Sequence, residues 1–412
     1  MTRCLFAAAL LALAPAAAGA QDENKYLKGR LGKFQIDEKG YFTRLVHDGT
    51  LVGAQFNQRA FQKGDVPNLL GLGTQWEALA LLGVHARWNP RLEPLSYYHR
   101  GGPVGAVFHH LRTRDSGKDA TAPVGVCGTF AGTPAAYALR GQEMTFYSVH
   151  EEPRELVERT DQYFTFVPDA RDRGAKLDFR YGPLREALAA DADKQFALLM
   201  VEMIEESYDP RDRLTLEAVK LYLDRTRPDG MVALHISNKR FRLEPVVERI
   251  ARELKLTARV WVDDAENRPG KAASSWVVLA RSEADLGPLA GSLYEQIVAF
   301  GTRNEAVATL LRRHRPQQPA YQAVEEEWGI PTTGPDAVPA WLVTRWKGPR
   351  VGLLYDHVER ARWDDDDITV GRLAERVYGT MFRPLVADPR VELRTDADRP
   401  GLPLWSSPPP KK

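Results

Sequence analysis

The chain has 412 residues, 43% of them hydrophobic, and is therefore long enough to bury a full core and to form two or three structural units. Its formal net charge is +1, and its acidic and basic residues are well mixed along the sequence. This balance excludes the long-range attraction on which binding to nucleic acids or acidic lipids depends, so we expect no nucleic-acid partner.

The first 20 residues have the layout of a secretory signal peptide. One arginine precedes an apolar core, and small residues end the segment before Gln21. We predict cleavage after Ala20 and a periplasmic or secreted protein, with no stable membrane span after cleavage. The alternative is an uncleaved anchor, although the apolar core is short for a bilayer span.

Cleavage would also leave Cys127 as the sole thiol of the mature chain, which therefore could form no internal disulfide. Cys127 stands at the end of an apolar strand with no histidine and acid beside it in the sequence. We interpret it as a small buried side chain rather than a nucleophile.

Residues 21–121 are predicted to form a small antiparallel β domain with a helical insertion. From Phe34 to Gln55 apolar and polar residues alternate around two hairpin turns, at Lys39-Gly40 and Asp48-Gly49. The GLGT string at 71–74 follows no strand, so we interpret it as a loop that opens a short helix.

The end of this region, residues 93–111, indicates a loop leading into a helix. His109 and His110 adjoin on that helix and point in different directions, so they cannot easily bind one metal ion. No metal site is predicted anywhere in the chain.

Residues 122–281 alternate between strand-like and helix-like segments. This alternation predicts an α/β fold with a doubly wound, mostly parallel sheet covered by helices. The expected strands are Val124–Cys127, Met144–Val149, Lys176–Arg180, Phe196–Val201, Met231–Ile236, Ala258–Val262 and Trp276–Ala280. The expected helices are Pro134–Leu139, Glu152–Thr160, Leu184–Ala190, Thr215–Thr226 and Leu243–Leu254.

Residues 282–400 are predicted to form an α-rich C-terminal region, followed by a disordered tail over 401–412. Its expected segments are two helices within Leu286–His314, a proline-rich connection through Pro339, a strand at Val351–Asp356 and a helix at Val370–Tyr378. The acidic run Asp364–Asp367 lacks the glycine and the last glutamate of a calcium loop, so we interpret it as a solvated turn.

The stretch Pro123–Tyr137, PVGVCGTFAGTPAAY, has the pattern of a strand, a glycine-bearing turn and a helix. In α/β proteins this construction brings backbone N–H groups against a nucleotide at the start of the helix. Here Phe130 stands midway between Gly128 and Gly132.

Several strings, in this order, resemble the spermidine synthase family of polyamine aminopropyltransferases, in its divergent bacterial branch. They are LVHDGTLVGAQ at 45–55, PLSYYHRGGPVG at 94–105, GTPAAY at 132–137, YFTFVPDAR at 163–171, and LHISNK and SSWVVLAR further on. The resemblance covers residues 26–289. It implies a methyltransferase-like fold preceded by a small β domain, and a decarboxylated S-adenosylmethionine cofactor if the protein is active.

The resemblance also implies which positions would bind that cofactor, and most of them carry the wrong residue. The family's three spaced glycines correspond to Gly128, Phe130 and Gly132, and a side chain at the middle position would crowd the ligand. The family's ribose-binding acid corresponds to Ser148, and its adenine-binding acid to Pro183. Proline suits a helix start, so the fold keeps its helix while the ligand contact disappears.

The family's catalytic aspartate corresponds to Glu202, whose longer side chain would misplace a base that must reach an attacking amine. Glu205 and Glu206 follow it and could bind a cationic amine. Gln55 and the string Tyr97, Tyr98 and His99 match positions that line the family's substrate pocket. The equally weighted alternative is that these residues only pack between domains.

We therefore expect an exported spermidine synthase-like protein with a degenerate nucleotide site. It would be non-catalytic, need no cofactor and bind a small cationic ligand such as a polyamine, or a protein partner. The alternatives are an active aminopropyltransferase or related transferase, and a chain whose C-terminal region binds a protein partner while the central fold acts as scaffold.

Overall fold

A computed structural model of the chain describes residues 25–29, 32–40, 42–47, 49–57, 92–128, 130–148, 163–203, 212–238, 240–264, 270–301, 305–332, 334, 368–379 and 381–398. Several predicted features lie outside these residues: the signal peptide, the GLGT string, the helix at 152–160, the strand at 351–356, the acidic run at 364–367 and the tail at 401–412.

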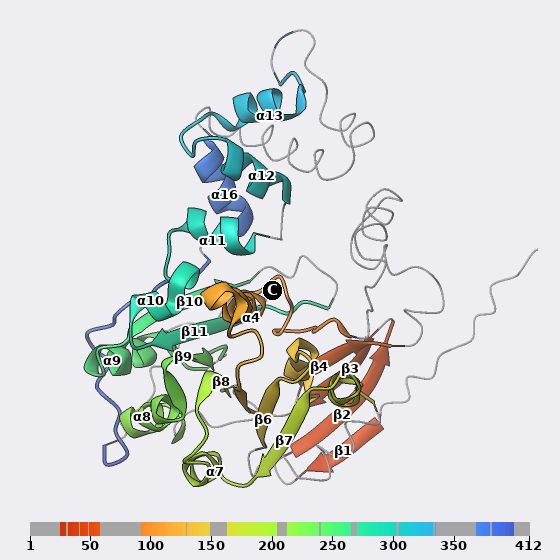
Figure 1. Ribbon diagram of the computed structural model, residues 1–412, viewed down its shortest axis with the longest axis vertical. Coiled ribbons are helices and arrows are strands. Elements are labelled where there is room, and N and C mark those ends of the chain that lie inside the picture. Colours follow the sequence, from red (N-terminus) through yellow and green to blue (C-terminus); the bar gives the residue numbers. More distant parts are fainter. Residues whose placement is uncertain are drawn as a thin grey trace, which may run out of the picture.

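The N-terminal unit is an antiparallel sheet of four strands, in the order β1-β2-β3-β4 (Figure 1). The strands are β1 (Lys25–Gly29), β2 (Gly32–Lys39), β3 (Phe42–His47) and β4 (Thr50–Phe56). Two of the turns carry Gly40 and Gly49 at φ values of 59° and 82°, a left-handed conformation that glycine adopts without steric cost. The alternating pattern buries Phe34, Ile36 and Leu45, so the predicted antiparallel unit is confirmed.

The central sheet has eight strands in the order β12-β10-β11-β9-β8-β5-β6-β7. Its strands are β5 (Val124–Cys127), β6 (Glu143–Ser148), β7 (Lys176–Tyr181), β8 (Phe196–Glu202), β9 (Thr226–His235), β10 (Thr257–Asp263), β11 (Ser274–Ala280) and β12 (Arg383–Pro384). The five strands from β5 to β9 pair in parallel, whereas β10, β11 and β12 pair antiparallel. The α/β fold with a mostly parallel sheet is thus confirmed.

The helices of the central unit are α4 (Pro103–Thr113), α6 (Phe166–Asp172), α7 (Leu184–Ala190), α8 (Leu216–Asp224), α9 (Glu244–Glu253) and α10 (Glu283–Leu286). Three short 3₁₀ helices join them: η2 (Arg114–Gly117), η3 (Thr133–Tyr137) and η5 (Gly287–Leu289).

The order of the parallel strands reverses at β5, with β6 and β7 on one side and β8 and β9 on the other. Because crossovers between parallel strands are right-handed, connections in opposite directions place their helices on opposite faces. Accordingly α6 packs against η3, and α7 packs against α8. This is the doubly wound arrangement that the alternation predicts.

Three local predictions differ from the structure. Residues 134–139 do not form the expected α-helix, because Thr133–Tyr137 is a five-residue 3₁₀ helix that starts after Gly132 in the left-handed conformation. The helix α6 is missing from the prediction, since its seven residues begin with Phe166 and Val167, which have low helix propensity. Strand β9 starts at Thr226 rather than Met231, because the strand includes the turn-forming residues 228–230.

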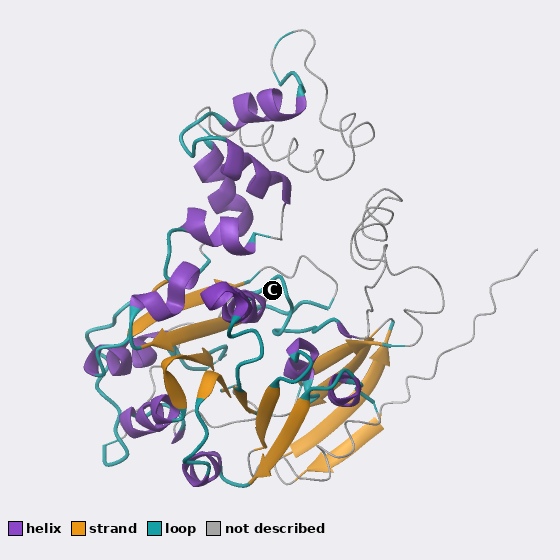
Figure 2. Ribbon diagram, in the orientation of Figure 1, coloured by secondary structure: helices purple, strands orange, loops and turns teal. Residues whose placement is uncertain are grey.

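The C-terminal region contains the helices α11 (Leu293–Phe300), α12 (Glu305–Arg313), α13 (Ala320–Trp328) and α16 (Val370–Tyr378). They contact one another as a small helical unit (Figure 1 and Figure 2). The helices expected within Leu286–His314 and at Val370–Tyr378 are confirmed. The connection expected after His314 contains α13, which the prolines around it conceal in the sequence.

After α16 the chain returns to the central sheet. It forms β12 on the edge of β10, and Arg394 inserts beside α8, where its Nε donates to the carbonyl oxygen of Leu214 at 3.3 Å. Arg185 on α7 forms an ion pair with Asp396 at 2.5 Å. The C-terminal region is therefore part of the same packed structure as the sheet, and its buried side chains belong to the same hydrophobic core.

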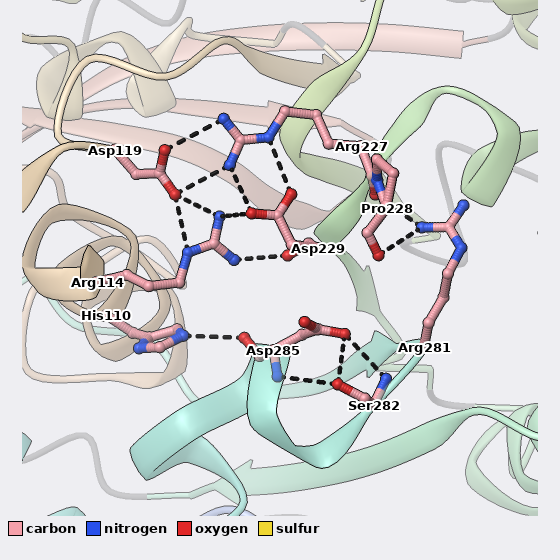
Figure 3. A network of polar contacts seen from close by, with 9 residues as sticks. All are labelled: His110, Arg114, Asp119, Arg227, Pro228, Asp229, Arg281, Ser282 and Asp285. Atoms are coloured by element: carbon pink, nitrogen blue, oxygen red, sulfur yellow. Dashed lines mark hydrogen bonds and ion pairs between the residues drawn. The ribbon is translucent and has the colours of Figure 1, made fainter.

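A cluster of ion pairs connects η2 and the residues just after it to the start of β9 (Figure 3). Asp119 accepts hydrogen bonds from Arg114 and from Arg227, the closest at 2.5 Å and 2.9 Å, and Asp229 also pairs with both arginines. Nearby, the His110 ring lies 3.1 Å from the carbonyl oxygen of Asp285 and ties α4 to α10. Each of these side chains already has a partner within the protein, so we assign the contacts to stability.

Among the described residues, no helix is both long and apolar enough to cross a bilayer.

Candidate functional site

The site predicted from the sequence lies where the parallel strands end. Because β8, β5, β6 and β7 are parallel neighbours, the residues that end or follow them lie along one edge of the sheet. Glu202, Phe130, Ser148 and Pro183 are these residues, in that order across the sheet. Glu205 and Glu206 lie outside the described residues.

The glycine loop after β5 combines left-handed backbone conformations with a buried phenylalanine side chain. Gly128, Phe130 and Gly132 all have positive φ values, of 112°, 41° and 69°. For Phe130 this is a strained backbone conformation, because it has a side chain. The Phe130 side chain is nevertheless buried in the core, with 2% of its surface exposed. Tyr181, at the end of β7, is 41% exposed.

Neighbouring elements approach the loop too closely to leave space above its backbone. A Cβ atom on Gly53 of β4 would lie 2.5 Å from the Cβ of Ala131, so the N-terminal sheet rests directly on the loop. A Cβ on Gly132 would lie 2.6 Å from a methyl carbon of Val167 on α6. The element that follows is only a short 3₁₀ helix, which presents a weaker dipole than an α-helix of several turns.

At the ends of β6 and β7, Ser148 and Pro183 stand at the two positions that the resemblance assigns to the nucleoside-binding acids. Ser148 is buried, with 1% exposed, and its carbonyl oxygen accepts from the N–H of Gly182 at 3.3 Å. Pro183 is the residue before α7, one position earlier than the helix start expected for it, and its carbonyl oxygen accepts from the N–H of Ala187 at 3.0 Å. Both positions therefore serve the local fold.

Glu202 is the most informative residue of the edge, because it is fully buried and both of its carboxylate oxygens have partners. The hydroxyl of Tyr98 donates to Oε1, and Nδ1 of His235 lies 2.7 Å from Oε2. The guanidinium of Arg213 donates to the Glu202 carbonyl oxygen at 2.8 Å.

The hydrogen bonds around His235 indicate which of its ring nitrogens donates to Glu202. The backbone N–H of Ser275 donates to the Ser237 hydroxyl at 2.8 Å, and that hydroxyl lies 3.0 Å from Nε2 of His235. A carboxylate oxygen accepts, so Nδ1, the nitrogen that faces it, is the hydrogen-bond donor to Glu202, and in the neutral ring Nε2 then accepts from the Ser237 hydroxyl. The imidazole also stacks on Trp276, with ring centres 4.5 Å apart and planes 1° apart.

The other candidate substrate residues are also engaged. The amide of Gln55 donates to the Thr165 hydroxyl at 2.7 Å and accepts from the Thr165 N–H at 2.8 Å, which fastens β4 to the start of α6. Tyr97 packs on His235 at 4.7 Å, and His99 Nδ1 accepts from the N–H of Gly101 at 3.0 Å. Such contacts agree with the alternative that these residues pack between domains.

Sequence reasoning missed His235 and a buried ion pair between Asp263 and Lys271, 2.7 Å apart. His235 is the histidine of the LHISNK string, and its place at the end of the apolar run Met231–Leu234 could have indicated a buried position. The ion pair joins residues on either side of a loop, so no local pattern reveals it. Within the described ranges, no group of three or more His, Cys, Asp or Glu side chains is placed to hold a metal ion. Cys127 is buried, and burial raises the pKa of its thiol.

Comparison with known proteins identifies similar folds only. No protein-family model matches the chain, and no curated protein does. Among solved structures, the spermidine synthase from Thermotoga maritima is 11% identical, with 80% of this chain and 87% of that chain covered and a TM-score of 0.40. A probable spermidine synthase from Corynebacterium glutamicum is 9% identical, with 63% and 80% covered and a TM-score of 0.35. An O-methyltransferase from Streptomyces achromogenes is 13% identical, with 50% and 95% covered and a TM-score of 0.34. These values do not establish a family for this chain.

Proposed function

We propose that this chain is an exported, non-catalytic binding protein whose strand-end edge takes no adenosylmethionine-type donor. The observation that carries the proposal is the environment of Glu202. A general base must reach the proton it removes, and both oxygens of this carboxylate already bind Tyr98 and His235 inside the core. An incoming amine would have to break this network.

The loop after β5 supports the same conclusion. The resemblance implies that a donor nucleoside would lie against this loop, where Phe130 replaces the middle glycine and Gly53 already approaches Ala131 closely. The export that the first 20 residues predict would agree with it, because such donors are made inside the cell. The ligand expected from the sequence is a small cation such as a polyamine, for which Glu205 and Glu206 supply carboxylates just after β8. A protein partner at the C-terminal region is the alternative.

Isothermal titration tests the proposal with S-adenosylmethionine, its decarboxylated form, putrescine and spermidine. We expect no binding of either nucleoside. Micromolar binding of a nucleoside that Phe130→Asp abolishes would instead support the active transferase. Polyamine binding should be lost in a variant with Glu205→Gln and Glu206→Gln, and no polyamine binding at all would refute the cationic ligand. Mass spectrometry of the exported protein should find a chain that starts at Gln21.

A further inference from the structure

A cavity lies away from the strand-end edge, between α4 and the C-terminal helices. Its volume is about 210 Å³, and it is bounded by α4, by Trp261 of β10, by the end of α11 and by the residues around the end of α16. None of Glu202, Phe130, Ser148 or Pro183 lines it. The C-terminal region therefore creates this cavity, and nothing in the glycine loop contributes to it.

Two guanidinium groups meet in this cavity over one aromatic ring. Arg100 lies 5.0 Å from the centre of the Tyr137 ring, and Arg112 lies 5.7 Å from it. The ring is fixed, because Phe108 stacks on it at 4.1 Å with planes 4° apart and the Tyr137 hydroxyl donates to the carbonyl oxygen of Tyr98 at 2.5 Å. The two cations are thus held near each other by a rigid support.

Their positive charge is only partly compensated. Arg100 pairs with Glu93 at 3.3 Å. Arg112 donates to the backbone carbonyl oxygen of Tyr137 and has no carboxylate partner among the described residues. Burial, and then the charge of Arg100, lower the pKa of Arg112, which means that its cation is destabilised where it stands. A bound anion would relieve this repulsion, and guanidinium groups bind carboxylates through paired hydrogen bonds.

The rest of the lining is apolar and aromatic. Trp261, Phe300 and Tyr378 face the cavity together with Tyr137, and His109 packs edge-on against Phe300 at 5.6 Å. A cavity of about 150 Å³ is enough to hold benzene in a protein core, so this one can hold a single ring with a small substituent. An inorganic ion would leave the aromatic walls without contacts.

We infer that this cavity binds a small planar organic carboxylate, with the carboxylate at Arg100 and Arg112 and its apolar body among the aromatic side chains. The inference is independent of the proposed function, because it uses a different cavity and holds whether or not the strand-end edge is catalytic.

Isothermal titration of the full-length protein with benzoate tests this inference, with benzamide as the neutral isostere, benzamidine as the cationic isostere and inorganic phosphate as the plain anion. We expect benzoate to bind about tenfold or more tightly than benzamide, and benzamidine not to bind, because a charge-assisted pair distinguishes them. Equal binding of benzoate and benzamide, or no benzoate binding at 10 mM, would overturn the inference. Phosphate binding as tight as that of benzoate would also overturn it.

Two variants locate the binding. Arg112→Gln should weaken benzoate binding by about tenfold or more, whereas Arg249→Gln, which changes a partly exposed arginine on α9, should leave it unchanged. Because Arg112 also supports Tyr137, a second variant leaves both guanidinium groups in place: Ala299→Phe fills the cavity from α11. It should abolish benzoate binding without changing the far-UV circular dichroism. Benzoate binding that persists in both Arg112→Gln and Ala299→Phe would place the ligand elsewhere and refute the site.

Discussion

Replacing Glu202 by glutamine distinguishes a structural carboxylate from a catalytic one. The amide retains an acceptor for Tyr98, but its NH₂ group then faces Nδ1 of His235, and two donors meet inside the core as long as the imidazole keeps its proton on Nδ1. A buried donor without an acceptor costs about 1–3 kcal/mol. Loss of the charge-assisted bond to Tyr98 adds about 1 kcal/mol. We therefore expect Glu202→Gln to lower the free energy of unfolding by about 2–4 kcal/mol.

Thermal unfolding followed by circular dichroism measures this effect. A loss of about 2–4 kcal/mol corresponds to a fall in Tm of roughly 2–5 °C for a protein of this size. The matched control is Glu253→Gln, the same change on α9, where the carboxylate is 46% exposed and pairs only with Arg249; its effect should stay within about 0.5 kcal/mol. A residue kept for catalysis is commonly a source of strain, so neutralising it leaves stability unchanged or raises it. An unchanged or higher Tm for Glu202→Gln would refute the structural role.

Two further predictions concern the ion cluster and the glycine loop. Burial alone would raise the pKa of Asp119, but hydrogen bonds from Arg227 and Arg114 outweigh it and hold the pKa below its usual value of 3.8. The stabilisation by Asp119 is therefore complete above pH 3.8 and is lost as the pH falls through the lower folded-state pKa. In urea unfolding at pH 7, the Asp119→Asn variant should be about 1–3 kcal/mol less stable than the unchanged protein. This difference should shrink below pH 3.8. At Gly132, an alanine meets both a φ of 69° and Val167 at 2.6 Å, so Gly132→Ala should cost about 1–3 kcal/mol in the same assay. The double variant with Val167→Ala should recover only the steric part, and full recovery would show that the positive φ carries no cost.

Much of the fold is predictable because it depends on local patterns. The alternation of Phe34 to Gln55 specifies hairpins, and the apolar runs from Val124 to Ala280 specify strands that must be buried on both faces. Two of the helices that prediction missed, α6 and α13, were missed for different reasons. The seven residues of α6 include a proline and begin with poor helix formers, so tertiary contacts decide it, whereas α13 consists mostly of good helix formers and is hidden by the prolines before it. Residues 133–137 also differ from the prediction, because they form a 3₁₀ helix rather than an α-helix.

The sequence by itself determined the α/β class, the hairpins before it and the residues that stand at the strand ends, because each follows from periodicity or from a string of neighbouring residues. Only the tertiary structure decided what those residues do. The contacts of Glu202 with Tyr98 and His235 join residues that are 104 and 33 positions from it in the chain. The cavity at Arg100 and Arg112 likewise needs α11 and α16 to close it. Such pairings have no local signature, because long-range packing alone brings the side chains within reach of one another.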